Sequence, residues 1–93
     1  MNNPLLVCAL ENEFKLKSTK FDILYTGVGK VNAAICITEY LAKDVFPKYV
    51  INYGTAGSKK IKVGTLVDCT KFIQRDMDAT GLGFEKYETP FDR

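Results

Sequence analysis

The sequence has no histidine, and its three cysteines form neither a C-x-x-C motif nor a cysteine and histidine pair. The ligand spacings of structural zinc sites are therefore missing, and we expect no metal. The number of cysteines is odd, and each of them has apolar or β-branched neighbours. They are Cys8, Cys36 and Cys69. This pattern predicts reduced thiols in the core and no disulfide framework.

The sequence also lacks a long hydrophobic run. No apolar stretch approaches the roughly 20 residues that span a bilayer, so no membrane partner is expected. No basic and then apolar leader precedes PLLVCAL, which makes the cytoplasm the expected compartment. The lysines of SKKIK have no interleaved aromatic residues, so we expect no nucleic-acid partner either.

The composition is that of an ordinary folded protein, with 46% hydrophobic and 26% charged residues. Apolar runs at 5–10, 21–25 and 49–53 predict three strands, and residues 65–73 predict a fourth. No repeat or linker interrupts the chain. A single domain over residues 1–93 with a modest core is therefore expected.

The second and third runs are separated by a helical pattern. Its apolar members recur at steps of three and four residues and predict an amphipathic helix between Gly29 and Pro47. They are Val31, Ala34, Ile35, Thr38, Leu41, Ala42 and Val45. Strands alternating with a helix indicate an α/β fold with a mixed or mostly parallel sheet, a flanking helix and a right-handed crossover.

Three turns that follow predicted strands carry small or acidic residues. Glu11 and Glu13 follow the first strand, Gly27 and Gly29 the second, and residues 54–57 the third. In a parallel sheet these turns meet at one edge and form a crevice with a carboxylate, amides and a hydroxyl. Such a crevice suits a neutral polar ligand, for example a nucleoside, better than a polyphosphate. Plain polar turns are the alternative.

The segment GVGK fits neither common nucleotide-phosphate motif. A dinucleotide fingerprint requires glycine or alanine where Asn32 stands, and a P-loop requires serine or threonine where Val31 stands. A tight turn from strand to helix is the simpler interpretation. The long loop from Arg75 onward has little periodicity, and loops of this length usually have a function or an external support.

Taken in order, several segments resemble the nucleoside phosphorylase and nucleosidase family, and most closely the methylthioadenosine/S-adenosylhomocysteine nucleosidases. They are ALENE, GVGKVNAA, VINYGTAG with KVGTLVD, and RDMDATGLGFEKYETP. Each segment alone is a weak signal, but their order is specific. The resemblance implies the N-terminal half of a nucleoside phosphorylase-like fold, a purine nucleoside ligand, hydrolysis of its N-ribosidic bond, and no cofactor. A small unrelated α/β binding module is the competing interpretation.

The resemblance also implies roles for individual residues. Glu13 matches the carboxylate that orients and deprotonates the attacking water. Asn52 stands where phosphorylases carry a phosphate-binding arginine, so water is the expected nucleophile and phosphorolysis the alternative. The substrate contacts that the resemblance assigns are Leu10, Val28, Thr55, Ala56 and Gly57.

Two departures from the family pattern affect the expected activity. Only residues 14–26 separate Glu13 from Gly27, fewer than in typical members. The glutamate that binds the ribose hydroxyls and the aspartate that protonates the purine belong to the family's second half and have no match here. We therefore expect a partial nucleosidase-like domain that is inactive alone. A catalytically inactive remnant that binds a nucleoside or self-associates is the alternative.

The resemblance finally places residues 79–90 across a dimer interface. Four members of this loop would close the partner's pocket, namely Ala79, Leu82, Phe84 and Pro90. A homodimer or higher oligomer is therefore expected. A loop that folds on its own subunit is the alternative.

Overall fold

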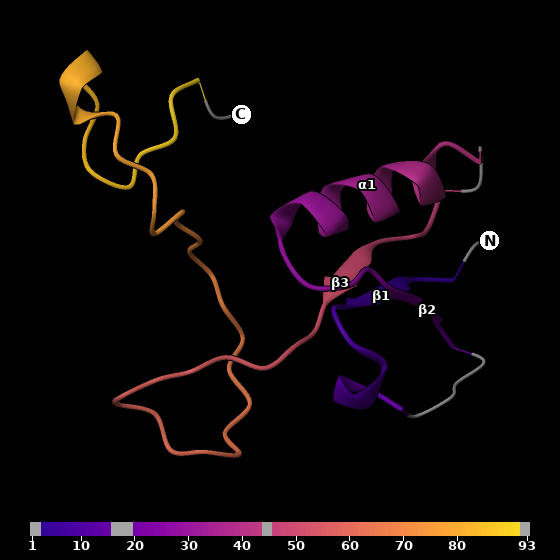
Figure 1. The fold of residues 1–93 in the computed structure, drawn as a ribbon. Helices are drawn as coiled ribbons and strands as arrows, with labels where there is room; N and C mark the ends of the chain where they lie inside the picture. The colour runs from indigo at the N-terminus through magenta and orange to yellow at the C-terminus, as the bar shows by residue number, and fades with distance from the viewer. Residues whose placement is uncertain (1–2, 16–19, 44–45, 92–93) are drawn as a thin grey trace. The chain divides into compact units, whose positions relative to one another are not determined.

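The computed structural model describes residues 3–15, 20–43 and 46–91. Val45, which the sequence pattern assigned to the helix, lies outside these ranges. The chain forms two compact units, Met1–Ser58 and Lys59–Arg93, which are described separately. The sheet and the α-helix belong to the first unit (Figure 1).

Three strands form a parallel sheet in the order β2-β1-β3 (Figure 1). They are β1 (Leu5–Cys8), β2 (Asp22–Tyr25) and β3 (Val50–Asn52). The register places Val7 beside Leu24 on one side and beside Asn52 on the other. Helix α1 (Lys30–Leu41) connects β2 to β3, so this connection crosses over β1. The predicted α/β fold with a parallel sheet and a flanking helix is confirmed.

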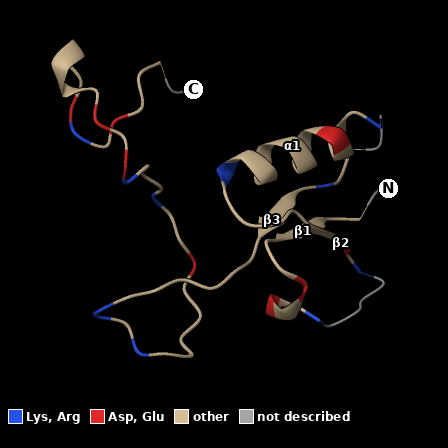
Figure 2. Ribbon diagram, in the orientation of Figure 1, with Lys and Arg blue, Asp and Glu red and all other residues tan. Residues whose placement is uncertain are grey.

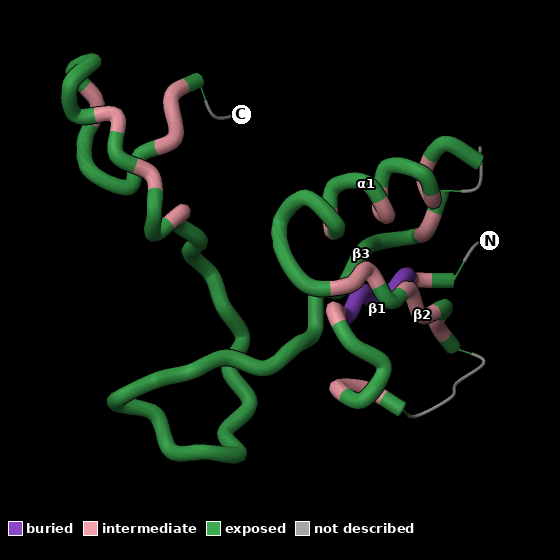
Figure 3. Tube along the Cα trace, viewed as in Figure 1, coloured by how far each residue is buried: buried purple, intermediate pink, exposed green. Residues whose placement is uncertain are grey.

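Strand β1 is the core of the first unit (Figure 3). Leu5 and Cys8 are 0% and 1% exposed. One face of the sheet is covered by α1, whose Ile37 lines a cavity with Val7. Successive residues of a strand point to opposite faces, and all four residues of β1 are buried. Coverage on both faces explains why β1 is a continuous apolar run with no alternation.

Helix α1 (Lys30–Leu41) forms where the sequence pattern predicts, but it ends well before Pro47. The predicted apolar face is mostly exposed, since Val31 and Ile35 are 72% and 54% exposed, although its member Leu41 is half-buried. The half-buried positions are Ala33, Cys36, Ile37, Tyr40 and Leu41. Apolar residues occupy both sides of this helix, so their periodicity could not decide which side packs on the sheet.

The second unit contains a single short helical turn among its described residues, η2 (Thr80–Leu82). Residues 65–73 have no regular secondary structure and are exposed throughout, so the predicted fourth strand is wrong. A strand requires a partner for its backbone hydrogen bonds, and the structure describes none for this segment.

The prediction that the cysteines lie in the core is confirmed for one of them and wrong for another. Cys8 is buried in β1, whereas Cys36 is half-buried and Cys69 is exposed. Cys69 lies in the segment that was expected to form the fourth strand, and its exposure follows from the missing strand. In the described part of the chain no helix is both long enough and apolar enough to cross a membrane.

Candidate functional site

The turns after the three strands meet at one edge of the sheet. The Gly27 amide donates to the Ala9 carbonyl at 2.9 Å, which joins the second turn to the first. The Tyr53 amide donates to the Val7 carbonyl, also at 2.9 Å, and carries the third strand's end alongside β1. Because the strands are parallel, their carboxyl ends lie together. The predicted convergence of the turns is confirmed.

Glu13 is the residue at which the first and third turns are joined. It ends the short helical turn η1 (Glu11–Glu13), directly after β1. Its Oε1 accepts a hydrogen bond from the Leu10 amide at 3.0 Å. Its Oε2 accepts two, from the Thr55 amide at 2.9 Å and from the Thr55 hydroxyl at 2.8 Å. Donors from two separate turns therefore hold one carboxylate.

These hydrogen bonds stabilise the charged form of Glu13. The hydroxyl and then the amide of Thr55, followed by the amide of Leu10, lower the pKa of Glu13 below its ordinary value. The carboxylate is consequently ionised at neutral pH. The Glu13 charge also affects Cys8 on β1. Burial is the main cause that raises the pKa of the Cys8 thiol, and the negative charge of Glu13 is the second. Cys8 is therefore a neutral neighbour of the site at neutral pH.

An ionised carboxylate of this kind can hold and activate a water molecule. It offers about four lone-pair directions, and the contacts from Leu10 and Thr55 use three. The backbone of Ala9 also lowers the pKa of Glu13, and Glu13 is only half-buried, so part of the side chain is accessible to solvent. Gly54 leaves room beside it, since a Cβ there would stand 3.5 Å from Oε2. Figure 2 shows the acidic residues of η1 at this end of the sheet.

The turn between β2 and α1 depends on glycine. Gly27 and Gly29 have φ angles of +82° and +98°, which residues with a Cβ rarely adopt. The Thr26 hydroxyl donates to the Gly27 carbonyl at 2.9 Å, and the side-chain amide Nδ2 of Asn32 donates to the Val28 carbonyl at 2.7 Å. Side chains on both sides therefore hold the turn, and Val28 between the two glycines is exposed.

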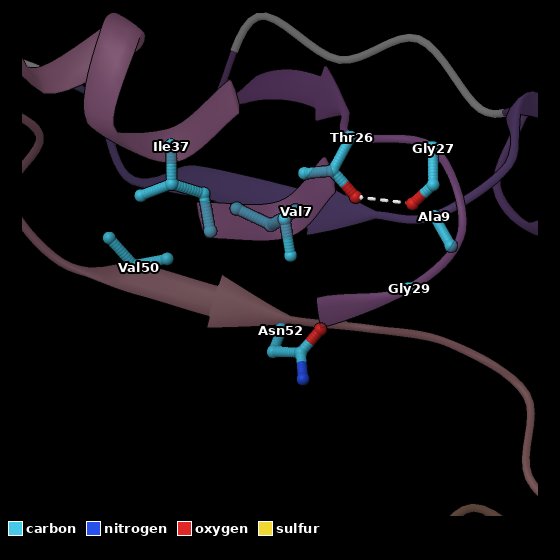
Figure 4. Close-up of a pocket in the computed structure, with 9 residues that line it drawn as sticks. Val7, Ala9, Thr26, Gly27, Gly29, Ile37, Val50 and Asn52 are labelled. Atoms are coloured by element: carbon cyan, nitrogen blue, oxygen red, sulfur yellow. Dashed lines mark hydrogen bonds between the residues drawn. The ribbon is translucent and has the colours of Figure 1, made fainter. Parts of the chain in front are cut away.

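A cavity of about 310 Å³ lies between α1 and the sheet (Figure 4). Its only polar side chains are Thr26 and Asn52, so most of the lining is apolar. Glu13 is not part of it. The lining residues are Val7, Ala9, Thr26, Gly27, Gly29, Ala33, Ile37, Val50 and Asn52. The cavity can take an apolar group at the same edge of the sheet, beside the glycine turn.

The structure brings some of the predicted substrate contacts to the carboxylate and leaves others apart. Leu10 and Thr55 contact Glu13 directly, Leu10 only through its backbone. Ala56 and Gly57 follow Thr55 and are exposed, and a Cβ on Gly57 would meet nothing within 4 Å. Val28 is exposed on the glycine turn. The substrate roles of all five stay predictions.

The predicted interface residues belong to the second unit, where the loop closes on itself. The Tyr87 amide donates to the Met77 carbonyl at 2.9 Å. Phe84 packs edge-on against Phe91, with ring centroids 5.8 Å apart. Ala79 and Pro90 are half-buried, whereas Leu82 is 79% exposed. Leu82 is thus the apolar member that is presented most openly.

Sequence reasoning missed the aromatic residues that support the Glu13 turn. Phe14 lies edge-on to Tyr53 with centroids 5.3 Å apart, and it also contacts Phe21 at 5.8 Å. The signal was present in the sequence, because Phe14 directly follows Glu13 and Tyr53 directly precedes Gly54. In the described ranges, no group of three or more histidine, cysteine, aspartate or glutamate side chains could hold a metal ion.

Comparison with known proteins identifies the family. Residues 13–93 match the phosphorylase superfamily, and the chain belongs to it. Similar relatives include 5'-methylthioadenosine/S-adenosylhomocysteine nucleosidases from Marinomonas, 39% identical over 70 residues, and from Exiguobacterium, 46% identical over 71 residues. Each alignment covers 73% of this chain and 30% of the relative. No solved structure matches the chain.

A third relative gives the same result over a longer alignment. The nucleosidase of that name from Haemophilus influenzae is 40% identical over 80 residues, which is 84% of this chain and 34% of the relative. The chain thus spans about a third of the length of the curated relatives it matches. The family match removes the hypothesis of an unrelated binding module.

Proposed function

We propose that this chain supplies the water-activating side of a nucleosidase site for purine nucleosides of the methylthioadenosine and S-adenosylhomocysteine type. The observation that supports it is the Glu13 carboxylate, held by three hydrogen bonds from Leu10 and Thr55. The names of the relatives support the same reaction class.

Hydrolysis of an N-ribosidic bond develops positive charge on the sugar as the purine departs. A water molecule held by Glu13 then adds to the anomeric carbon, and Glu13 accepts its proton. The lowered pKa keeps the Glu13 carboxylate ionised, so it can accept a hydrogen bond from the water and stabilise the positive charge that develops on the sugar. The ribose would approach the small residues 54–57, which present backbone atoms without bulky side chains.

Water is proposed as the nucleophile in preference to phosphate. Asn52 at the end of β3 is neutral, and in the described residues 9–13 there is no cation after β1. A phosphate dianion needs charge-assisted donors such as arginine. The products distinguish the two reactions, because hydrolysis releases a free reducing sugar and phosphorolysis releases a sugar 1-phosphate.

The proposal assigns these residues one side of the site. No residue of this chain is assigned to grip the ribose hydroxyls or to protonate the purine. A general acid typically contributes about 10²–10⁴-fold. We therefore propose that the 93-residue chain binds the nucleoside without releasing adenine at an enzymatic rate. Cytoplasmic function in a self-associated form, with residues 79–90 at the interface, is part of the same proposal.

The test is a titration of the ¹⁵N-labelled chain with methylthioadenosine, followed by amide shifts. We expect the amides of Leu10, Thr55 and Ala56 to shift together and saturably. Glu11→Gln is the control and should leave these shifts unchanged. It removes a carboxylate from the same helical turn but leaves the contacts of Glu13 in place. Absence of saturable shifts at these amides would contradict the proposal. Robust adenine release by the chain alone would contradict the proposal that this chain supplies only the water-activating side of the site.

A further inference from the structure

Thr55 contacts Glu13 with both of its donors, and both meet the same carboxylate oxygen. The amide lies 2.9 Å and the hydroxyl 2.8 Å from Oε2. The contact from Leu10 closes η1 within its own turn, across three residues. The contact from Thr55 instead bridges two strand ends that are 42 residues apart in the sequence. Thr55 therefore fixes the carboxylate relative to the sheet.

The direction of the hydrogen bond determines what else the Thr55 hydroxyl can do. An ionised carboxylate only accepts hydrogen bonds, so the hydroxyl must give its single proton to Glu13. Toward a ligand, the same oxygen can then act only as an acceptor. The resemblance implies that Thr55 contacts ribose and purine, whereas the geometry assigns its only side-chain proton to the carboxylate.

We propose that Thr55 is a positioning residue, whose amide and hydroxyl hold the Glu13 carboxylate in one orientation against the turn after β3. Its consequence for catalysis rests on the proposed function, because a carboxylate held in one orientation would present the same side to the attacking water each time. The hydrogen bonds themselves do not depend on that function. Fixing a catalytic group in advance removes the need to order it during the reaction.

The chain offers an internal comparison for this pair. The Thr80 amide and hydroxyl donate to Asp78 Oδ1 at 3.1 Å and 2.6 Å. They too lower the pKa of the carboxylate that they contact. The two residues are separated by two positions, so this contact closes only a local turn. Thr80→Val is therefore a matched control that removes the same hydroxyl from the same kind of contact.

The experiment is an NMR titration of the side-chain carboxyl carbons in the full 93-residue chain, with Glu13 assigned from Glu13→Gln. We expect Thr55→Val to raise the pH midpoint at which the Glu13 carboxyl titrates. Thr55→Ser should keep this midpoint at the wild-type value. Thr80→Val should raise the midpoint of Asp78 and leave that of Glu13 unchanged. A Glu13 midpoint unaffected by Thr55→Val would overturn the proposal.

Two other titratable groups act near Glu13 and must be separated from it. Glu11 shares its helical turn, and Glu11→Gln tests whether its charge affects the midpoint of Glu13. Cys8 on β1 interacts with the Glu13 charge, but burial raises its pKa further from the range in which carboxylates titrate. With both accounted for, a change in the Glu13 midpoint reports the contact with Thr55.

A second measurement needs no substitution and decides the case even if Thr55→Val does not fold. In the wild-type chain, the amide protons of Thr55 and Leu10 should both shift with the midpoint of the Glu13 carboxyl carbon. A Thr55 amide that does not follow this titration would refute the contact. No nucleoside enters either experiment, so a failure here is distinct from a failure of nucleoside binding or hydrolysis.

Discussion

The Thr55 hydroxyl lies 2.8 Å from the Glu13 carboxylate although 42 residues separate them in the sequence. Parallel pairing makes this contact possible. Strands β1 and β3 are direct neighbours with the same direction, so the residues that follow them emerge at the same edge. A contact between two turns thus depends on the register of the sheet.

Glu13→Gln should lower kcat much more than it weakens substrate binding. The amide cannot accept the water's proton, and that proton moves only in the transition state. In a chimera in which this chain replaces the matching third of the Exiguobacterium nucleosidase, we expect a loss in kcat of about 10²–10⁴-fold. KM should change little, and Glu11→Gln should be nearly silent. An unchanged kcat would remove Glu13 from the mechanism.

The Glu13 contact should also make stability depend on pH. Folding lowers the pKa of Glu13, so the unfolded chain binds its proton first as the pH falls. The stabilisation is therefore complete above the ordinary glutamate pKa of about 4.3 and is lost as the pH falls through the lower folded value. Thermal midpoints of wild type and Thr55→Val should differ near neutral pH and converge toward about pH 2. Equal midpoints at neutral pH would contradict this.

Much of the first unit could be predicted from the sequence. Its strands are short apolar runs, and Gly27 and Gly29 mark the start of the helix because few other residues adopt their φ angles. The approach of Glu13 to the third turn could be anticipated from parallel topology alone. The sequence could not predict that Thr55 donates both of its protons to that carboxylate, because this depends on register and side-chain rotamers.

The two errors in the fold have a common physical origin. Residues 65–73 have the composition of a strand, yet they are irregular, and the described part of the chain provides no strand that pairs with them. Helix α1 has apolar residues all round, and only packing on the sheet decides that Ile37 faces inward and Ile35 outward. In both cases the outcome depended on contacts with another element, present for α1 and missing for residues 65–73, which the local sequence does not encode.

Leu5→Ala should destabilise the first unit strongly. Leu5 is 0% exposed on the central strand, and removing a buried leucine side chain typically costs about 2–5 kcal/mol. Leu66→Ala is the control, because Leu66 is 83% exposed and its loss should stay within about 0.5 kcal/mol. Urea denaturation followed by circular dichroism compares the two. Similar midpoints for both variants would show that β1 is not the core.

Gly27→Ala should destabilise the turn that leads into α1. Its φ of +82° is unfavourable for alanine, and the added Cβ would stand 3.4 Å from the Asn32 side-chain nitrogen. We expect a loss of about 1 kcal/mol or more in the free energy of unfolding. Gly81→Ala is the control, because a Cβ at Gly81 would meet nothing within 4 Å and its φ is not positive. An equally stable Gly27→Ala would show that the turn tolerates a side chain.

Self-association through residues 79–90 gives the last prediction. Leu82 is 79% exposed, and burying such a side chain against a second copy would remove apolar surface from water. Light scattering at micromolar concentration should therefore show a dimer or larger species. Leu82→Asp combined with Phe84→Asp should give a monomer, because each aspartate would have to be buried unpaired.

Phe91→Asp separates this interface from the folding of the loop itself. Phe84 and Phe91 pack against each other, so either substitution breaks the same ring contact. Only Phe84 is assigned to the interface, and the Phe91→Asp chain should therefore keep the assembly of the wild type. If Phe91→Asp also gives a monomer, the loop acts through its own fold. If the wild-type chain is monomeric, or if the Leu82 and Phe84 substitutions leave its mass unchanged, the interface role of this loop is wrong.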